Sequence, residues 1–496
     1  MMAGTLLHGM SLTRLLDGLV PVPPACERQV EALTLDSRAV TPGACFVALT
    51  GTRDDGARYA ADAIARGALA VIADKPLAGL RPDVPVLCVP GLRGLLGELA
   101  NRFYAAPSAA LALCAVTGTN GKSSVAHLLA QAADGLGLGG GYIGTLGAGR
   151  LTALAPLANT TPDVLSINRW LAAFRDDGCG VAALEASSHA LSQGRLDGLA
   201  LRAAAFTNLG HDHLDYHASL ADYAAAKRRL FEHPGLGAAV LNVDDALGME
   251  LAHDLSARMP CWTTSSRGAD ARLRASDIEV TPHGMRFMLE LDGVRHVVQS
   301  ALAGRFNVDN LLTVSGLLRA LDVAPADIVA LLPRLRGVTG RAEECARTPR
   351  GARVFVDYAH SPDSLAAILA TLRALGPRRL LLVFGCGGDR DRSKRPLMGA
   401  VAEHDADLLI VTSDNPRSEA PEAIVAEILA GLRAPSAARV VLDRADAIRA
   451  ALALAEADDI VLVAGKGHER TQEIGGRVLA FSDHAEIAHA IAEQRP

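Results

Sequence analysis

Aromatic residues are scarce in this sequence. Phe, Tyr and Trp make up 4% of its 496 residues, whereas 50% of the residues are hydrophobic and 47 are glycine. Such a composition disfavours an aromatic-rich β-sandwich and suits helices packed closely on sheets. Because the chain is too long for one hydrophobic core, we expect roughly three domains.

The sequence also lacks an excess of positive charge and any long hydrophobic run. Its formal net charge is -6, so we expect no basic face for a nucleic-acid backbone. No apolar run approaches the ~20 residues of a membrane-spanning helix, and the N-terminus lacks the cationic and apolar segments of an export signal. We therefore expect a cytoplasmic protein that binds neither nucleic acid nor membranes. The oligomeric state is not decided by these features, although a monomer is favoured.

Cysteine pairs are missing as well. The eight cysteines are scattered and form no CxxC motif. In a chain far larger than a disulfide-stapled domain, this pattern indicates reduced, buried thiols.

The first part of the chain has the pattern of a small α/β domain. Short β-like runs are separated by turns and by an Ala-rich helical stretch, and we place this domain at residues 1–91. The predicted strands are 45–51, 68–74 and 84–90, and the helix is 59–67.

The middle of the chain alternates buried strands with helices, as right-handed βαβ connections in a parallel sheet require. We predict a doubly wound, P-loop-type domain over residues 92–338. Its predicted strands are 111–116, 180–186, 203–209 and 237–243, and its first helix is 124–137.

After a Gly-rich, basic stretch at 335–344, the same alternation begins again. It predicts a third α/β domain, Rossmann-like, over residues 339–496. Its predicted strands are 353–359, 378–386, 406–413, 438–443 and 458–465.

A glycine-rich loop lies between the strand at 111–116 and the following helix. Here backbone N–H groups and a helix N-terminus can hold phosphates. Lys122 would neutralise the β- and γ-phosphates, and Ser123 stands where a P-loop hydroxyl meets Mg²⁺. Val116 occupies the position of the usual first glycine. A glycine-rich helix start with an incidental lysine is the alternative, but ATP binding is favoured. The loop is Gly118, Thr119, Asn120, Gly121, Lys122, Ser123 and Ser124.

The segment TGTNGKSS resembles the ATP loop of the Mur ligases and the folylpolyglutamate synthetases. The resemblance extends over nearly the whole chain. It implies three domains that bind, in order, a UDP-linked substrate, ATP and an amine substrate. It also implies that Asn310, Arg341 and Asp357 face the nucleotide.

Acidic and imidazole side chains follow two of the predicted strands. Glu185 ends one strand, where a carboxylate can face phosphates and bind Mg²⁺. The run at 207–217 could by itself be a zinc site, but the phosphate loop favours Mg²⁺. The resemblance implies that Glu185 and His213 hold Mg²⁺ and that Lys227 carries an N-carbamate. Without the resemblance, Lys227 would be interpreted as a solvated helix lysine.

Two polar stretches offer hydroxyls, amides and a guanidinium for a peptide carboxylate. Polar loops and helix caps are the alternative interpretation. The resemblance implies that these stretches hold the L-Ala-D-Glu part of UDP-N-acetylmuramoyl-L-alanyl-D-glutamate, while the segment at 35–38 contacts the uridine nucleotide. The residues concerned are Leu35, Ser37, Asn159, Thr160, Thr161, Ser187, Gln193 and Arg195. Thr52, Arg53 and Asp54 depart from the family pattern in the uridine loop.

Two further motifs follow strands of the third domain. Arg417 could hold a carboxylate bidentately, and Asp414 and Glu469 could attract an ammonium group. A lone DNPR would otherwise be a capped turn. In the family, DNPR is the pattern of members that add meso-diaminopimelate. The resemblance assigns this substrate to Arg390, Asp414, Asn415, Pro416, Arg417, Gly465 and Glu469. Ser393 replaces the family glycine in the loop around Arg390.

The expected reaction is an ATP-dependent ligation through an acyl phosphate. Lys122, Glu185, His213 and Lys227 would stabilise the transferred phosphoryl group electrostatically. Two alternatives remain: the same chemistry with L-lysine or another acceptor, and a nucleotide-regulated ATPase switch.

Overall fold

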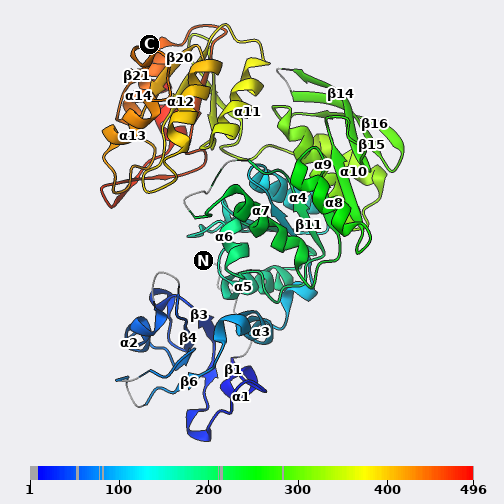
Figure 1. The fold of residues 1–496 in the computed structure, drawn as a ribbon, viewed down its shortest axis with the longest axis vertical. Coiled ribbons are helices and arrows are strands. Elements are labelled where there is room, and N and C mark those ends of the chain that lie inside the picture. Colours follow the sequence, from blue (N-terminus) through cyan, green and yellow to red (C-terminus); the bar gives the residue numbers. More distant parts are fainter. Residues whose placement is uncertain are drawn as a thin grey trace. The chain divides into compact units, whose positions relative to one another are not determined.

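A computed structural model describes residues 9–51, 55–77, 79–80, 83–210, 212, 216–281 and 284–494 (Figure 1). The chain forms two compact units. The first contains residues up to Ala115, Gly137–Ala203 and Arg229–Gly237, and the second contains Val116–Leu136, Ala204–Arg228 and the residues from Ala238 onward.

The beginning of the first unit is a four-stranded parallel sheet of order β3-β4-β5-β6. All five residues of β4 are buried, because helices cover both of its faces. α2 packs on one face, and α1 and α3 pack on the other. The elements are β1 (Met10–Ser11), α1 (Leu12–Leu15), β2 (Gln29–Val30), β3 (Ala32–Thr34), β4 (Ala44–Ala48), α2 (Ala60–Ala65), β5 (Ala70–Ala73), β6 (Val86–Cys88) and α3 (Leu92–Tyr104).

The rest of the first unit contains the strand order β7-β10-β8-β9. β10 and β8 run parallel, and β9 returns antiparallel to β8. The division between the units passes through β7 itself, after Ala115. The elements are β7 (Ala112–Thr117), β8 (Gly140–Gly144), β9 (Gly147–Gly149), α5 (Val164–Asp176), β10 (Val181–Glu185) and α6 (Ser188–Ser192).

In the second unit the strand order is β7-β11-β12-β13-β14-β15-β16. β11 to β14 are parallel, whereas β14, β15 and β16 form an antiparallel meander. The elements are α4 (Lys122–Gly135), β11 (Ala203–Phe206), α7 (Leu220–Arg228), β12 (Ala239–Asn242), α8 (Ala246–Leu255), β13 (Cys261–Ser265), β14 (Leu273–Thr281), β15 (Gly284–Leu291), β16 (Val294–Ser300), α9 (Phe306–Ala320) and α10 (Pro325–Leu331).

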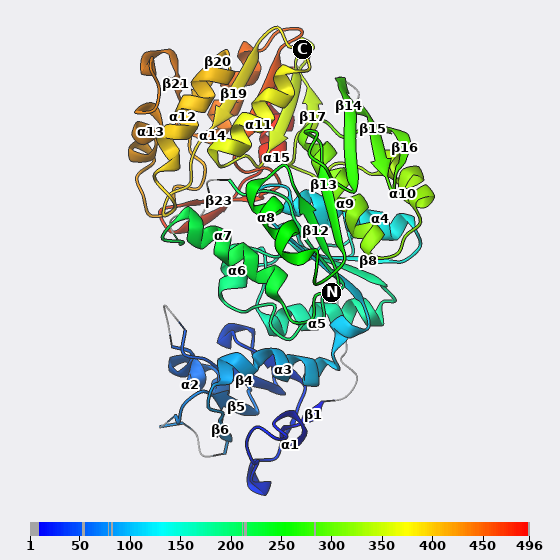
Figure 2. The same ribbon diagram turned by 45° about the vertical axis from the view of Figure 1, so that its right-hand side comes forward.

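The C-terminal part of the second unit has a six-stranded sheet of order β17-β18-β22-β19-β20-β21. All its strands are parallel except β17. α11, α12 and α13 cover one face, and α14 and α15 cover the other (Figure 2). The elements are β17 (Glu343–Arg347), β18 (Arg353–Asp357), α11 (Pro362–Arg373), β19 (Leu380–Phe384), α12 (Lys394–Asp405), β20 (Leu408–Val411), α13 (Pro421–Leu429), β21 (Arg439–Val440), α14 (Arg444–Leu454), β22 (Ile460–Ala464), β23 (Thr471–Ile474), β24 (Arg477–Ala480) and α15 (Asp483–Glu493).

The predicted α/β class is confirmed, and each predicted strand segment overlaps an observed strand. The meander β14-β15-β16 was not predicted. Its signal was present in β15, whose side chains alternate between buried and more exposed positions, as in a strand covered on one face only.

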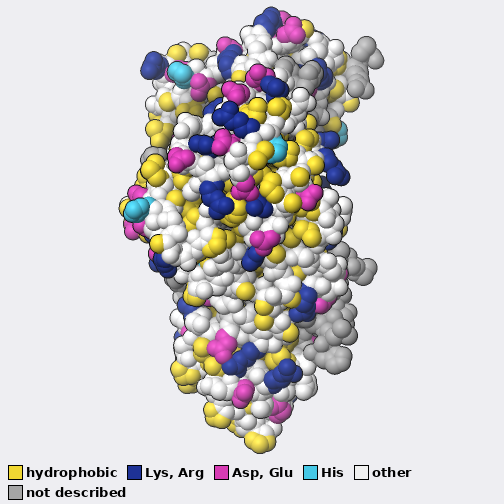
Figure 3. Space-filling model, turned by 90° about the vertical axis from the view of Figure 1, so that its right-hand side faces the viewer, with side chains coloured by type: hydrophobic (Ala, Val, Ile, Leu, Met, Phe, Trp, Pro, Cys, Tyr) yellow, Lys and Arg dark blue, Asp and Glu magenta, His cyan; other side chains and the backbone are white. Residues whose placement is uncertain are grey.

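The helices and the distribution of surface charge complete the description. No helix within the described ranges is long and apolar enough to cross a membrane. On the face drawn in Figure 3, basic and acidic side chains are interspersed and do not gather by sign.

Candidate active site

The phosphate loop connects the end of β7 to the start of α4. Gly118 has φ 144° and Gly121 has φ 87°, a backbone conformation that residues with a Cβ rarely adopt. A Cβ on Gly118 would overlap the Thr207 hydroxyl. No side chain caps the start of α4, and its first turn contains no acidic residue. The first N–H groups of this helix are therefore suited to an anionic ligand.

The segment after β11 forms hydrogen bonds with this loop. Asn208 accepts hydrogen bonds from Thr119 N at its carbonyl (2.7 Å) and from Asn120 N at Oδ1 (3.0 Å). Thr207 Oγ1 donates to the Asn120 carbonyl at 2.6 Å. Because four loop contacts come from one short segment, including Gly210 N to Thr119 Oγ1 at 2.8 Å, the loop is fixed before a ligand binds.

Lys122 and Ser123 make hydrogen bonds within and next to the loop. Lys122 Nζ donates to the carbonyls of Gly118 (2.9 Å) and Thr119 (2.8 Å). Ser123 is 5% exposed, and its Oγ accepts a hydrogen bond from Arg341 Nη2 at 3.4 Å. The structure thus brings Arg341 next to the loop.

Asn310 and Asp357 are both buried. Asn310 lies next to the loop, and Asp357 lies next to Arg341. Asn310 Oδ1 would lie 2.8 Å from a Cβ on Gly121, and its amide donates to Asn307 Oδ1 at 2.8 Å. Asp357 accepts N–H bonds from Ala342 (2.6 Å) and Ala359 (2.7 Å). Burial raises the pKa of Asp357, although Arg341 acts in the opposite direction. Asp357 therefore orders the backbone next to Arg341.

Lys227, on α7, is 1% exposed, so its interpretation as a solvated lysine is wrong. Its Nζ lies 4.0 Å from the ring centre of Tyr223, one helical turn earlier. Burial, followed by the nearby Lys122 ammonium, lowers the pKa of Lys227 well below its usual value, although Asp212 and Asp245 oppose this. When the pKa of a buried amine is lowered, a larger fraction of its molecules is neutral, and therefore nucleophilic, than for a lysine at the surface.

Asp212 connects the segment after β11 to the C-terminal sheet within the second unit. Its carboxylate lies 3.8 Å from His360 Nε2 and 4.0 Å from Lys394 Nζ. His213, the predicted metal ligand, lies outside the described residues, as do His211 and the segment 52–54.

In the first unit, Glu185 ends β10 and is fully buried. Its Oε1 accepts hydrogen bonds from Tyr142 OH (2.5 Å) and Thr145 N (2.9 Å), and its Oε2 accepts one from Thr145 Oγ1 (3.2 Å). Sequence reasoning did not identify Tyr142 or Thr145. Tyr142 lies within β8 and Thr145 directly follows it, and that position was their only signal in the sequence.

The polar stretches predicted to hold the peptide part come together around Thr161. Thr161 Oγ1 donates to the Glu185 carbonyl at 2.6 Å, and its own carbonyl accepts a bond from Arg195 Nη1 at 2.5 Å. Arg195 also donates to Gln193 Oε1 at 2.8 Å. Ser187 N donates to Thr161 Oγ1 at 3.0 Å. The structure thus unites these residues in one cluster.

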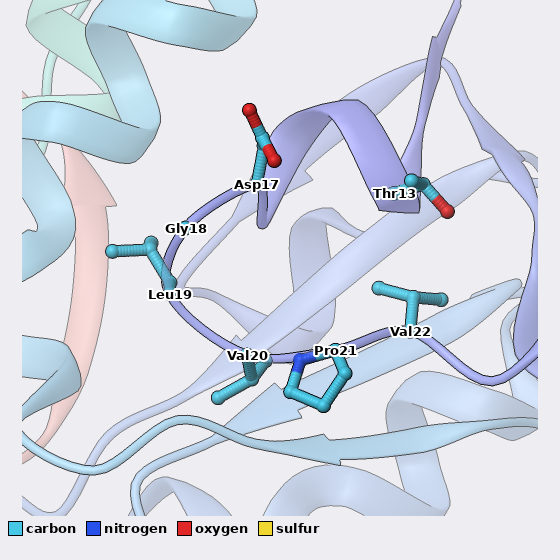
Figure 4. A pocket seen from close by; sticks show the side chains of 7 residues that line it. All are labelled: Thr13, Asp17, Gly18, Leu19, Val20, Pro21 and Val22. Carbon is cyan, nitrogen blue, oxygen red and sulfur yellow. The ribbon is translucent and has the colours of Figure 1, made fainter.

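The other residues predicted to bind the UDP-linked substrate are only partly brought together. Thr160 Oγ1 lies 3.2 Å from Thr145 Oγ1, whereas Asn159 is exposed. Leu35 and Ser37 follow β3 in the N-terminal sheet, and Ser37 is 9% exposed. A separate pocket beside α1 is lined by Thr13, Asp17 and residues 18–22 (Figure 4). It contains none of the predicted site residues.

The residues predicted to bind diaminopimelate follow β19, β20 and β22, which are adjacent in the sheet in the order β22-β19-β20. Arg417 has φ 52°, its Nη1 donates to the Gly388 carbonyl at 2.7 Å, and its Nε lies 3.4 Å from Glu473 Oε2. Asp414 Oδ1 accepts a bond from Asn415 N at 2.7 Å. Its Oδ2 is buried without a hydrogen-bond partner among the described atoms.

Arg390, by contrast, is exposed, and Pro416 is buried. The Pro416 carbonyl approaches Gly388 so closely that a Cβ on Gly388 would overlap it. This approach brings the loop after β19 and the loop after β20 together at the carboxyl edge of the sheet, where parallel α/β folds bind ligands.

A metal centre is not complete within the described residues: no three His, Cys, Asp or Glu side chains there could hold a metal ion together. The predicted donors are nevertheless compatible with Mg²⁺. Ser123 and Glu185 offer oxygen atoms, and so would a carbamate on Lys227. Oxygen is the donor that Mg²⁺ prefers.

Comparison with known proteins gives three matched regions along the chain. Residues 29–104 match the family described as Mur ligase family, catalytic domain. Residues 116–318 match Mur ligase middle domain, and residues 340–467 match Mur ligase, glutamate ligase domain.

Individual relatives match over almost the full length. The chain is 49% identical over 485 residues to a UDP-N-acetylmuramoyl-L-alanyl-D-glutamate--2,6-diaminopimelate ligase of Xanthomonas campestris pv. campestris (strain 8004), covering 97% of this chain and 98% of the relative. It is 47% identical over 476 residues to a protein of the same name from Ectopseudomonas mendocina (strain ymp), covering 95% and 97%. A solved structure with this name matches with a TM-score of 0.68 and 36% identity, covering 98% of this chain and 99% of that one.

Proposed function

The chain belongs to the Mur ligase family of ATP-dependent ligases, and we propose that it adds meso-2,6-diaminopimelate to UDP-N-acetylmuramoyl-L-alanyl-D-glutamate. The new amide joins an amine of diaminopimelate to the γ-carboxyl of the D-glutamate. This reaction would serve peptidoglycan synthesis in the cytoplasm. The three matched regions support the assignment of residues 1–91 to the UDP substrate, 92–338 to ATP and 339–496 to the amino acid.

The observation that carries the choice of amino acid is the pairing of opposite charges after β20. The buried Asp414 Oδ2 is an acceptor without a partner among the described atoms, and Arg417 lies three residues later. An amino-acid head group has one ammonium and one carboxylate, which these two side chains can bind. Diaminopimelate carries such a head group at each end, so one end can bind while the other reacts. L-Lysine lacks the second carboxylate and would leave Arg417 without its ligand.

The chemistry begins with activation of a poor acyl donor. A γ-carboxylate oxygen attacks the γ-phosphorus of ATP, ADP leaves, and an acyl phosphate forms. Lys122 and the N–H groups at the start of α4 stabilise the charge on the phosphoryl oxygens. The amine then attacks the acyl carbon and loses a proton, and inorganic phosphate leaves. No side-chain nucleophile is required.

In this proposal the cluster at Thr161 binds the L-Ala-D-Glu part of the substrate, whose γ-carboxylate is the acyl donor. Arg195 supplies a positive charge next to Gln193 and Thr161, which suits a carboxylate of the L-Ala-D-Glu part. Leu35 and Ser37 would contact the uridine nucleotide.

Magnesium would bind at Ser123, Glu185, His213 and carbamylated Lys227. When bound, it supplies positive charge to the phosphate oxygens during transfer. The buried, low-pKa amine of Lys227 supports the modification, because only a neutral amine adds to carbon dioxide. Replacing Lys227 by Arg would place a permanent cation there and prevent the carbamate, and should abolish ligation.

The deciding experiment measures phosphate release from ATP with the UDP-linked dipeptide and Mg²⁺, comparing meso-diaminopimelate with L-lysine. We expect release with diaminopimelate only and a tripeptide product of the corresponding mass. Equal rates with both amines would remove the role of Arg417 in specificity. Release that needs neither amine nor dipeptide would favour the ATPase switch.

A further inference from the structure

The loop after β22 contains a lysine whose side chain has no exposed surface. Lys466 Nζ donates to Asn415 Oδ1 at 3.0 Å and to Glu469 Oε2 at 2.7 Å. The lysine is 0% exposed, and Glu469 is 29% exposed. A buried ammonium is costly unless it is paired and hydrogen-bonded. Lys466 is therefore tied to two residues that the proposed function assigns to the amino-acid substrate.

These bonds determine which way the Asn415 amide points. Its Oδ1 accepts from Lys466 Nζ and also from Glu473 N at 3.0 Å, while its Nδ2 donates to Glu469 Oε2 at 2.9 Å. A flipped amide would place N–H groups against two donors and its oxygen against a carboxylate. Asn415 consequently presents only its remaining N–H, which can donate to a substrate carboxylate.

Two carboxylate oxygens in these loops have no hydrogen-bond partner within the described part of the chain. Both bonds to Glu469 fall on Oε2, and Oε1 has no hydrogen bond within the described part of the chain. Asp414 Oδ2 is likewise without a partner there, and a Cβ on Gly465 would lie 2.5 Å from it. Two carboxylates and one ammonium leave a single negative charge, which matches one substrate ammonium.

We propose that Lys466 is a positioning residue for the amino-acid substrate. It holds Asn415 as a donor for the substrate carboxylate and Glu469 as an acceptor for the substrate ammonium, without touching the substrate itself. This inference rests on the proposed function, in which an amino acid binds between the loops after β20 and β22.

The first test is Lys466→Met in the full-length chain. The KM for meso-diaminopimelate should rise about tenfold or more, since a charged hydrogen bond of this kind is worth a factor of that order. The KM values for ATP and for the UDP-linked dipeptide should stay within about twofold, because those sites keep their contacts. The measurement is phosphate release at varied concentrations of each substrate in turn.

The matched control is Arg379→Met. Arg379 lies just before β19, and its Nη2 pairs at 2.6 Å with the buried Asp459, which precedes β22. This variant also removes a cation from a buried carboxylate of the same sheet, but at the edge opposite to Lys466. It should lower thermal stability without changing the KM for diaminopimelate.

A double variant separates positioning from folding. Lys466→Met with Glu469→Gln removes the cation and the anion together, so thermal stability should recover. Its KM for diaminopimelate should exceed that of Glu469→Gln alone, because Asn415 has also lost its bond from Lys466. A KM equal to that of Glu469→Gln alone would overturn the inference, as would an unchanged KM in Lys466→Met.

The wild-type chain in the same assay reports on the proposed function separately. If it uses a different amino acid, the proposed substrate is wrong, and the KM ratio of variant to wild type for that amino acid still decides the role of Lys466. Phosphate release with no amino acid at all would overturn both.

Discussion

Arg444 and Asp483 form a bidentate ion pair in which neither side chain is exposed. Nε lies 2.7 Å from Oδ1 and Nη2 lies 2.8 Å from Oδ2. Arg444 also donates to the carbonyls of Ser413 (3.4 Å) and Ala464 (2.9 Å). These carbonyls directly precede Asp414 and Gly465, so the pair links α14 and α15 to the backbone of the proposed amino-acid site.

Replacing Asp483 by Ala should destabilise the second unit by about 3 to 5 kcal/mol, because it leaves the Arg444 charge buried without its partner. Urea unfolding followed by circular dichroism measures this. The control is Asp446→Ala, which removes an exposed pair with Arg449 and should cost less than about 1 kcal/mol. Equal losses of unfolding free energy in the two variants would mean that the buried Arg444 pair stabilises the fold no more than an exposed pair does.

Gly118→Ala should reduce ATP-dependent phosphate release on the order of 100-fold, since the phosphate loop would have to move. The new Cβ would overlap the Thr207 hydroxyl in a backbone conformation with φ 144°. Gly94→Ala is the control, because it lies within α3 and its Cβ would meet no atom within 4 Å. Full activity in Gly118→Ala would contradict the assignment of this loop to ATP.

Arg417→Ala should raise the KM for diaminopimelate about 10-fold to 100-fold and leave that for ATP nearly unchanged, because it removes a charged contact to one substrate only. Steady-state kinetics with each substrate varied measures the two effects. Arg373→Ala is the control, as it removes an exposed ion pair between the last residue of α11 and Asp407, outside the proposed site. Similar increases for both substrates would refute the role given to Arg417.

The pair of Glu343 and His484 should make stability depend on pH. The distance from Nε2 to Oε2 is 2.9 Å. The hydrogen bond between them raises the pKa of His484 above 6.5 and lowers that of Glu343 below 4.5. The histidine contribution is complete below pH 6.5 and is lost as the pH rises through the raised pKa, whereas the glutamate contribution is lost as the pH falls through the lowered pKa.

His484→Gln should therefore be destabilised relative to the wild type between about pH 4.5 and 6.5, and the difference should shrink toward about pH 8.5. Urea unfolding at several pH values measures the free-energy difference. A difference that is constant with pH would show that the ion pair does not stabilise the fold.

The chain order of the strands, the phosphate loop and the motifs after β20 and β22 could be predicted from the sequence. Each depends on a local pattern: a buried strand shows as a short apolar run, and a loop that needs φ above zero shows as glycine. Gly118 and Gly121 illustrate this, because both have the backbone conformation that the loop pattern implies. The meander of β14 to β16 was missed because its alternating pattern is weaker than a continuous apolar run.

The sequence by itself thus determined the fold class and the family, and it predicted which residues along the chain form the site. Only the tertiary structure decided the burial of Lys227, whose charge is opposed by Lys122 from a distant part of the chain. It also decided that Tyr142 and Thr145 hold Glu185, and that Lys466 lies between Asn415 and Glu469. The reason is physical: burial and long-range hydrogen bonds depend on which segments fold against one another, and local residue patterns do not record that.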